Sequence, residues 1–167
     1  MSEAKETKTE AEQKNAAQFS LQKIYIRDLS FESPAPAEYF LKKNFMPEIN
    51  LQLNAESSKL SDDVYEVVLN ITLTAKDKEA DKICYLVELK QAGIFTLANF
   101  PRKDLEAMVN SYCVNILFPY AREAISSIIE KGGFPQLLLA PINFDALYQQ
   151  HMERVKQSMQ PSSEARH

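Results

Sequence analysis

The stretch "GGFPQLLLAPINFDALY", residues 132–148, decides how the second half of this chain is organised. Two of the chain's three glycines stand side by side at its start, and leucines follow between Pro135 and Pro141. Glycines end helices and prolines disfavour them, so these residues predict a stiff, extended connector between two helices. Consecutive side chains of an extended backbone point to alternate sides, so the run Leu137–Leu139 cannot all cover one core. The side left over predicts an interface or a binding surface.

Helical patterns flank the connector on both sides. From residue 104 onward, apolar residues recur with the period of 3.6 that is typical of a helix, and Gly132 and Gly133 end the pattern. Pro119 lies inside this long helix and predicts a kink there or a break near Phe118. After the connector, Asn143 is a favoured N-cap residue, so a second, C-terminal helix is predicted to begin there.

The first half of the chain alternates apolar and polar residues, which predicts strands. Four segments show this pattern, namely residues 19–32, 49–55, 64–76 and 83–97. In the first of them the apolar set changes face partway, which a β-bulge or a two-faced strand would explain. Polar turns are predicted at 57–63 and 77–82, and a proline-containing connection, with room for one helical turn, at 34–48. The chain is therefore predicted to be α+β, with a four-stranded antiparallel sheet, as a meander or a close variant, and two helices.

Composition bounds the class of protein. The chain has 167 residues, of which 45% are hydrophobic and 25% charged, as expected for one globular domain. Its formal net charge of −4 argues against a nucleic-acid-binding protein, which needs a basic face. No apolar run reaches the roughly 18 residues that a membrane span needs, and the charged N-terminus lacks the apolar core of a signal peptide.

The chain termini and the two cysteines allow further predictions. Residues 1–17 and 159–167 contain few large apolar side chains, so we expect disordered tails around a domain at 18–158. Cys84 and Cys113 lie in apolar segments without CxxC spacing, which predicts buried free thiols in a reducing cytosol.

Catalysis is disfavoured by the motifs. The chain has two histidines, no glycine-rich phosphate loop and no metal-ligand spacing, so we expect neither an enzyme nor a cofactor or metal. One alternative remains open, a small enzyme that uses Asp28 or Glu88 as a general base in an enclosed pocket.

The other candidates for a functional site are binding surfaces. Asp28, Glu32, Leu86 and Glu88 occupy strand positions and form either a solvated sheet face or a docking site for a basic partner. The many large apolar residues are core, an oligomer interface, or a groove for extended apolar segments.

Two of these segments resemble a known family. "YCVNILFPYAREAIS" and "GGFPQLLLAPINFDALY" are similar to the signature helix and connector of the SecB family of bacterial protein-export chaperones. "FSLQKIYIRDLSFESP", "YEVVLNITLTA" and "VELKQAGIFTL" resemble that family's strands in the same order. The resemblance covers residues 19–148, most of the chain.

The resemblance implies a fold and a function. The fold is a four-stranded antiparallel sheet with a long helix and a C-terminal helix packed on one face, assembled as a homotetramer, a dimer of dimers. The function is that of a cytoplasmic holdase that uses no ATP, keeps precursor proteins unfolded and hands them to the SecA ATPase at the translocon. Neither nucleic-acid binding nor direct membrane insertion is expected.

The resemblance also implies site residues. A basic, zinc-bearing tail of SecA is expected to dock on an acidic motif that corresponds here to Asp28, Glu32, Leu86 and Glu88. The groove for unfolded clients is expected between sheet and connector, at Ile49, Leu51, Leu53, Tyr85, Tyr120, Leu137, Leu138 and Leu139. A SecB-like chaperone dedicated to one client, such as an antitoxin, would use the same fold. The acidic motif favours export, because a dedicated chaperone needs no SecA.

Overall fold

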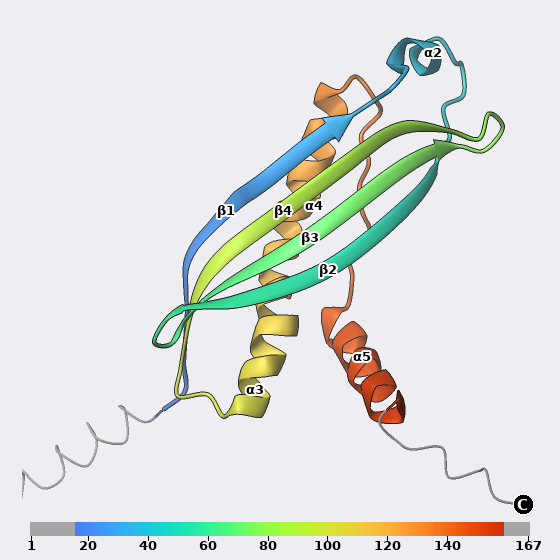
Figure 1. The fold of residues 1–167 in the computed structure, drawn as a ribbon. Coiled ribbons are helices and arrows are strands. Elements are labelled where there is room, and N and C mark those ends of the chain that lie inside the picture. The colour runs from blue at the N-terminus through green and yellow to red at the C-terminus, as the bar shows by residue number, and fades with distance from the viewer. Residues whose placement is uncertain (1–15, 159–167) are drawn as a thin grey trace, which may run out of the picture.

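The computed structural model describes residues 16–158. Its four strands are β1 (Gln18–Glu32), β2 (Glu48–Ser61), β3 (Val64–Asp77) and β4 (Lys82–Ala98). They form one antiparallel sheet in the order β1-β4-β3-β2, which confirms the predicted fold class (Figure 1). The predicted tails lie outside the described residues except for positions 16 and 17, so the domain boundaries stay a prediction.

The sheet is a close variant of the meander. Strands β2, β3 and β4 follow one another as hairpins, whereas β1 lies beside β4, which is a Greek-key order. A long connection that contains the single-turn helix α2 (Pro36–Phe40) carries the chain from the β1 edge to the β2 edge (Figure 1). The turn predicted at 57–63 is wrong in extent, because β2 continues to Ser61. Only Asp62 and Asp63 separate β2 from β3, and Asp63 adopts a φ of 59°, which Asp tolerates better than most residues.

Strand β1 contains two β-bulges, which explain its irregular pattern. The pairing with β4 shifts between Leu21 and Lys23 and again between Ile26 and Asp28. After each shift, the next apolar residue of β1 again points to the face of the sheet that the helices cover. The leucines, isoleucines and phenylalanines of β1 therefore all pair with the helix-facing residues of β4, in the pairs Phe19↔Leu97, Leu21↔Phe95, Ile24↔Gly93, Ile26↔Gln91, Leu29↔Leu89 and Phe31↔Val87.

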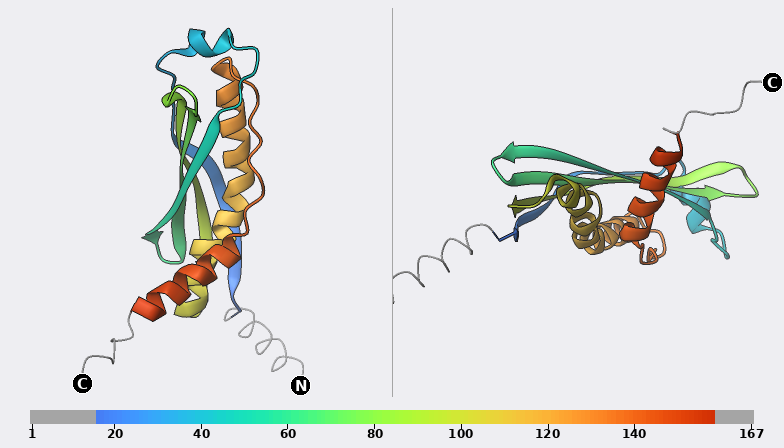
Figure 2. Two further views of the ribbon diagram at one scale, coloured as in Figure 1. Left: turned by 90° about the vertical axis from the view of Figure 1, so that its right-hand side faces the viewer. Right: turned by 90° about the horizontal axis from the view of Figure 1, so that it is seen from below.

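The helices lie on one side of the sheet. The first helical run consists of α3 (Arg102–Ala107), the π-helical segment η1 (Met108–Tyr112) and α4 (Cys113–Lys131), and α5 (Phe144–Ser158) follows the connector. Figure 2 shows α4 and α5 against the same face. The predicted break near Phe118 is wrong, because α4 continues through Pro119. The irregular turn of this run is η1, upstream of the proline.

The core lies between α4 and the central strands. Fully buried side chains of β3 and β4, such as Leu69, Ile71 and Leu89, meet Leu117 and Ile125 of α4. Cys84 and Cys113 are both buried and free, as predicted. Burial raises the pKa of the Cys113 thiol to about 12, so this thiol stays protonated and unreactive at neutral pH.

Gly93 of β4 lets α4 approach the sheet. A Cβ atom at this position would lie 2.9 Å from Leu117 Cδ2 and 2.7 Å from Phe95 Cε2. Both neighbours are fully buried, so neither has free space to move into.

We therefore expect Gly93→Ala to lower the free energy of unfolding by about 1–3 kcal/mol, as overpacking of a core does. Urea unfolding at a fixed subunit concentration measures the change. Ser20→Ala, an exposed position of β1, is the matched control and is expected to stay within about 0.5 kcal/mol. Equal stability of the two variants would show that α4 is not held at this distance.

Candidate functional site

The connector begins with a tight helix end. Phe134 N–H donates to the Ile129 carbonyl at 3.2 Å, and Gly133 N–H donates to the Glu130 carbonyl at 2.9 Å. This pair of bonds is the Schellman motif, and Gly133 supplies the required left-handed backbone with a φ of 83°. The glycine pair thus ends α4 as predicted and turns the chain back along it.

Phe134 anchors the connector in an aromatic cluster. Its ring centroid lies 4.8 Å from that of Tyr85, 5.1 Å from that of Phe40 and 5.4 Å from that of Phe45. Tyr85 is only 2% exposed, and its ring also stacks on Phe31. Tyr85 therefore belongs to the core of this subunit and not to its surface, unlike the groove position expected for it.

The three connector leucines alternate as an extended chain requires. Leu139 is buried at 7% exposure, Leu137 is half-buried, and Leu138 is 69% exposed. The connector runs beside α4, toward the β2 side of the sheet (Figure 1). Leu138 lines a hollow of about 380 Å³ between the connector and α4, and Tyr120, which is half exposed, does not line that hollow.

Helix α5 is attached at its first turn. Asn143 Oδ1 accepts from Ala146 N–H at 3.0 Å, which confirms the predicted N-cap. Asp145 accepts a hydrogen bond from Ser111, a buried residue of η1. The Phe144 ring packs edge-on against Phe118, with centroids 5.2 Å apart.

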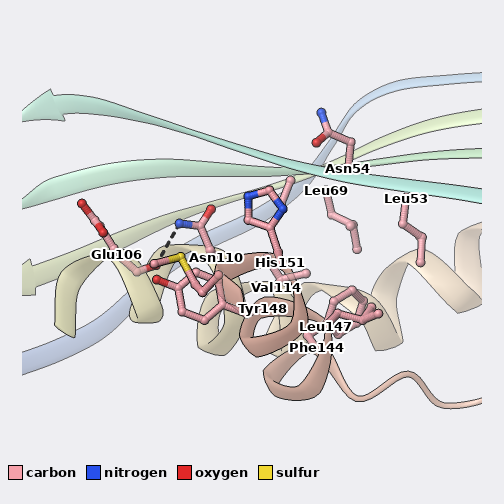
Figure 3. Close-up of a pocket in the computed structure, with 12 residues that line it drawn as sticks. Leu53, Asn54, Leu69, Glu106, Asn110, Val114, Phe144, Leu147, Tyr148 and His151 are labelled. Atoms are coloured by element: carbon pink, nitrogen blue, oxygen red, sulfur yellow. Dashed lines mark hydrogen bonds between the residues drawn. The ribbon is translucent and has the colours of Figure 1, made fainter. Parts of the chain in front are cut away.

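These attachments leave a cavity between α5 and strand β2. It has a volume of about 340 Å³, and Figure 3 shows its labelled side chains arranged around it. Leu53, the only predicted groove residue among them, contributes from β2, and Leu147 and Tyr148 contribute from α5. Sequence reasoning missed the α5 residues, because their apolar stripe had the pattern of a helix that packs only on its own core.

We define the trough as the helix-facing side of β2 together with the hollows at its two ends. Ile49, Leu51 and Leu53 lie half-buried along it, opposite Ala75, Leu73 and Ile71 of β3. At one end is the cavity beside α5, and at the other is a hollow of about 600 Å³ lined by residues that include Phe45, Met46 and Pro47. Strand β2 is an edge strand, so one side of its backbone is free of sheet pairing.

The opposite face of the sheet carries the four predicted docking residues. In the β1–β4 register, Glu32 pairs with Leu86, Ser30 with Glu88, and Asp28 with Lys90. Paired residues of antiparallel strands share a face, so Asp28, Glu32, Leu86 and Glu88 lie together on the face that points away from α4. Figure 2 shows that α3, α4 and α5 leave this outer face open.

A shallow hollow of about 330 Å³ lies within the outer face. Asp28 and Glu88 line it together with residues of β2 and β3, among them Glu56 and Asn70. Within residues 16–158, no group of three His, Cys, Asp or Glu side chains is arranged to hold a metal ion. No helix of the described part is long and apolar enough to cross a membrane.

The chain is similar in sequence to known proteins. A family model described as preprotein translocase subunit SecB matches residues 12–155. The protein-export protein SecB of Methylococcus capsulatus is 47% identical over 156 residues, covering 93% of this chain and 98% of the relative. That of Marinobacter nauticus is 50% identical over 143 residues, covering 86% of this chain and 85% of the relative.

A solved structure shares the fold. The SecB-like chaperone of Mycobacterium tuberculosis, in complex with a ChAD peptide from the HigA1 antitoxin, superposes with a TM-score of 0.57 at 14% identity. The match covers 75% of this chain and 91% of that one. Since the family model spans most of the chain and the two export proteins match it over most of their own lengths, this chain belongs to the SecB family of protein-export chaperones.

Proposed function

We propose that this chaperone is a cytoplasmic holdase that binds unfolded precursor proteins without ATP and delivers them to SecA. The observation that carries the proposal is the trough, where an edge strand presents three apolar side chains in a row between two hollows. SecB proteins act as chaperones, a non-enzymatic function, so Asp28 and Glu88 need no role as a general base.

The trough suits clients that share no sequence. Burying apolar surface contributes about 25 cal/mol per Å², whatever the order of the residues that supply it. The free edge of β2 offers backbone donors and acceptors to an extended segment, which every unfolded chain can match. Folded proteins have already paired these groups, so the trough favours unfolded chains.

Release follows from the placement of the two surfaces. The trough lies on the helix side of the sheet, whereas Asp28, Glu32, Leu86 and Glu88 lie on the outer face. SecA can therefore dock through a basic segment while the client is still bound. Each local client contact is weak, because a flexible chain loses entropy when it is ordered, so the client can move to SecA without nucleotide hydrolysis by this chain.

A chaperone dedicated to one client is the second candidate. The Mycobacterium tuberculosis protein holds a peptide from an antitoxin, and its fold is shared. The acidic outer face distinguishes the candidates, because only delivery to SecA requires it. Binding of one antitoxin peptide, with no binding of other unfolded chains, would favour the dedicated role.

We propose that the functional particle is a homotetramer, a dimer of dimers. Four large apolar side chains, each more than 40% exposed, flank the β1 edge and α4, namely Leu21, Ile26, Tyr112 and Tyr120. Within residues 16–158, no strand lies beyond β1, and apolar residues beside a free edge are suited to contact a second subunit. Tyr120 thus fits an interface better than the groove that sequence reasoning assigned to it.

Sedimentation equilibrium is expected to give four subunits of 19.0 kDa. Ile26→Lys is expected to shift the particle toward smaller species, because it places a charge in the proposed contact. Leu60→Lys, an equally exposed apolar position near the end of β2, is the control. A wild-type chain that sediments as a monomer at micromolar concentration would contradict the interface.

Leu138→Ser is expected to weaken binding of an unfolded client about fivefold. We propose that the client extends from the trough onto the connector hollow that Leu138 lines. The variant then loses an apolar contact whose burial contributes about 1–2 kcal/mol. Reduced, carboxymethylated α-lactalbumin is a suitable client, and isothermal titration measures its dissociation constant.

Leu60→Ser provides the matched control for this measurement, because Leu60 is also exposed but belongs to β2 and does not line the connector hollow that Leu138 lines. Thermal unfolding should be the same for both variants. If native α-lactalbumin binds the wild-type chain as tightly as its unfolded form, the holdase proposal is wrong.

Reversing both Asp28 and Glu88 to lysine is expected to weaken SecA binding by a factor of about 100 or more, because repulsion replaces attraction on the docking face. Client binding should be unchanged. Titration of purified SecA at low salt measures the effect, and Glu153→Lys on α5 serves as a control on the opposite side of the sheet. Normal SecA binding by the double variant would remove the docking assignment.

A further inference from the structure

We propose that the docking face extends across the whole sheet, with Glu56 of β2 as an additional recognition residue and Lys90 as an opposing charge that limits affinity. The proposal rests on the proposed delivery to SecA and adds the residues that set the strength of docking. Its occupant is an arginine side chain on an extended basic segment of the partner.

The register brings these residues together from all four strands. Asp28, Lys90, Asn70 and Asn54 form one row across the outer face, since each pairs with the next. Glu56 belongs to a neighbouring row, opposite Val68. All five outward-facing side chains, with Glu88 and Thr72, surround the hollow of about 330 Å³.

Hydrogen bonds hold Glu56 toward the hollow. Its Oε1 atom accepts from Asn70 Nδ2 at 2.9 Å and from Asn54 Nδ2 at 3.5 Å. The carboxylate therefore leans out of its own row and toward that of Asp28. No ion pair within the described residues neutralises Asp28, Glu56 or Glu88.

Glu66, a nearby carboxylate on the same face, already has a cationic partner within the subunit, unlike the three carboxylates of the hollow. Glu66 accepts hydrogen bonds from Tyr25 and Ser58 and forms an ion pair with Arg27 at 3.3 Å. Its charge is satisfied within the subunit. The three carboxylates of the hollow form no ion pair within residues 16–158 and share one lysine, Lys90, so a cation from a partner is the complementary group.

The polar atoms of the hollow favour arginine over lysine. When Asn70 donates its amide group to Glu56, its Oδ1 atom remains buried without a hydrogen-bond partner in the described part of the chain. Because this atom is buried, the acceptors that the hollow offers to a partner are the carboxylates of Asp28, Glu56 and Glu88. A guanidinium group carries five donors in a planar arrangement and can satisfy several acceptors at once, which an ammonium group does less well.

Lys90 acts against this attraction. It lines the hollow directly between Asp28 and Asn70 and forms no ion pair within residues 16–158. An incoming cation must approach its ammonium group. We infer that Lys90 keeps docking weak enough for SecA to leave after it has received the client.

Titration of the intact oligomer with purified SecA at about 50 mM salt tests the proposal. Glu56→Gln is expected to weaken binding about fivefold, and Lys90→Gln to tighten it about fivefold. Both effects should shrink below about twofold at 0.5 M salt, because surface charges are then screened. Glu153→Gln and Lys103→Gln make the same charge changes on helices at the opposite face and should leave SecA binding unchanged.

Two further measurements separate the outcomes. A basic peptide whose cationic residues are all arginine should bind the wild type more tightly than the same peptide with lysine, and Glu56→Gln should reduce that difference. Asp28→Asn with Glu88→Gln should lose SecA binding if the docking face itself is correct. If that double variant loses binding while Glu56→Gln and Lys90→Gln bind as the wild type does, the extension is overturned and the proposed function stands. If the double variant binds normally, delivery through this face fails, and the extension fails with it.

Discussion

The close contact between α4 and the sheet at Gly93 is the constraint on which the two surfaces depend. This contact places α4 against β4 and its neighbours. The Leu117 side chain of α4 fills the space that a side chain at position 93 of β4 would need. A helix is about 10 Å wide, whereas four strands about 4.8 Å apart span a broader face. One helix therefore cannot cover the whole face, and the β2 side is left to the connector and α5, which cover it only in part (Figure 2).

Because the connector and α5 cover the β2 side of the sheet only in part, the apolar residues of the trough remain accessible in the folded chain. Ile49, Leu51 and Leu53 keep the alternation of core residues but stay half-buried, because α4, the long helix of the described residues, lies against the other strands (Figure 2). The connector is held at one end by Phe134 in its aromatic cluster and at the other by the cap of α5. Between these anchors its extended backbone must expose one leucine for each one it buries. Stiffness keeps the apolar surface available instead of letting it collapse onto the core.

The sheet also separates the apolar trough from the charged docking residues by placing them on opposite faces. Because side chains alternate across a strand, neighbouring residues of β4 serve different faces, with Val87 and Leu89 in the core and Glu88 on the outside. The two bulges of β1 extend this separation to a strand whose sequence breaks the alternation. The outer face can then hold charges without placing any of them against the apolar trough. A client and a docking partner would thus meet the same sheet on opposite sides.

The sequence by itself determined the element types, the antiparallel sheet, the end of the long helix and the cap of α5. These follow from local causes, namely periodicity, glycine conformation and side-chain capping. Only the tertiary structure decided that β1 lies beside β4, that the helix relaxes at η1 instead of breaking at Pro119, and that β2 extends to Ser61. It also decided that Tyr85 is core, that Tyr120 lies away from the connector hollow and that Glu56 leans toward Asp28. These outcomes depend on which side chains meet across strands distant in sequence, and a pattern along one chain does not contain that information.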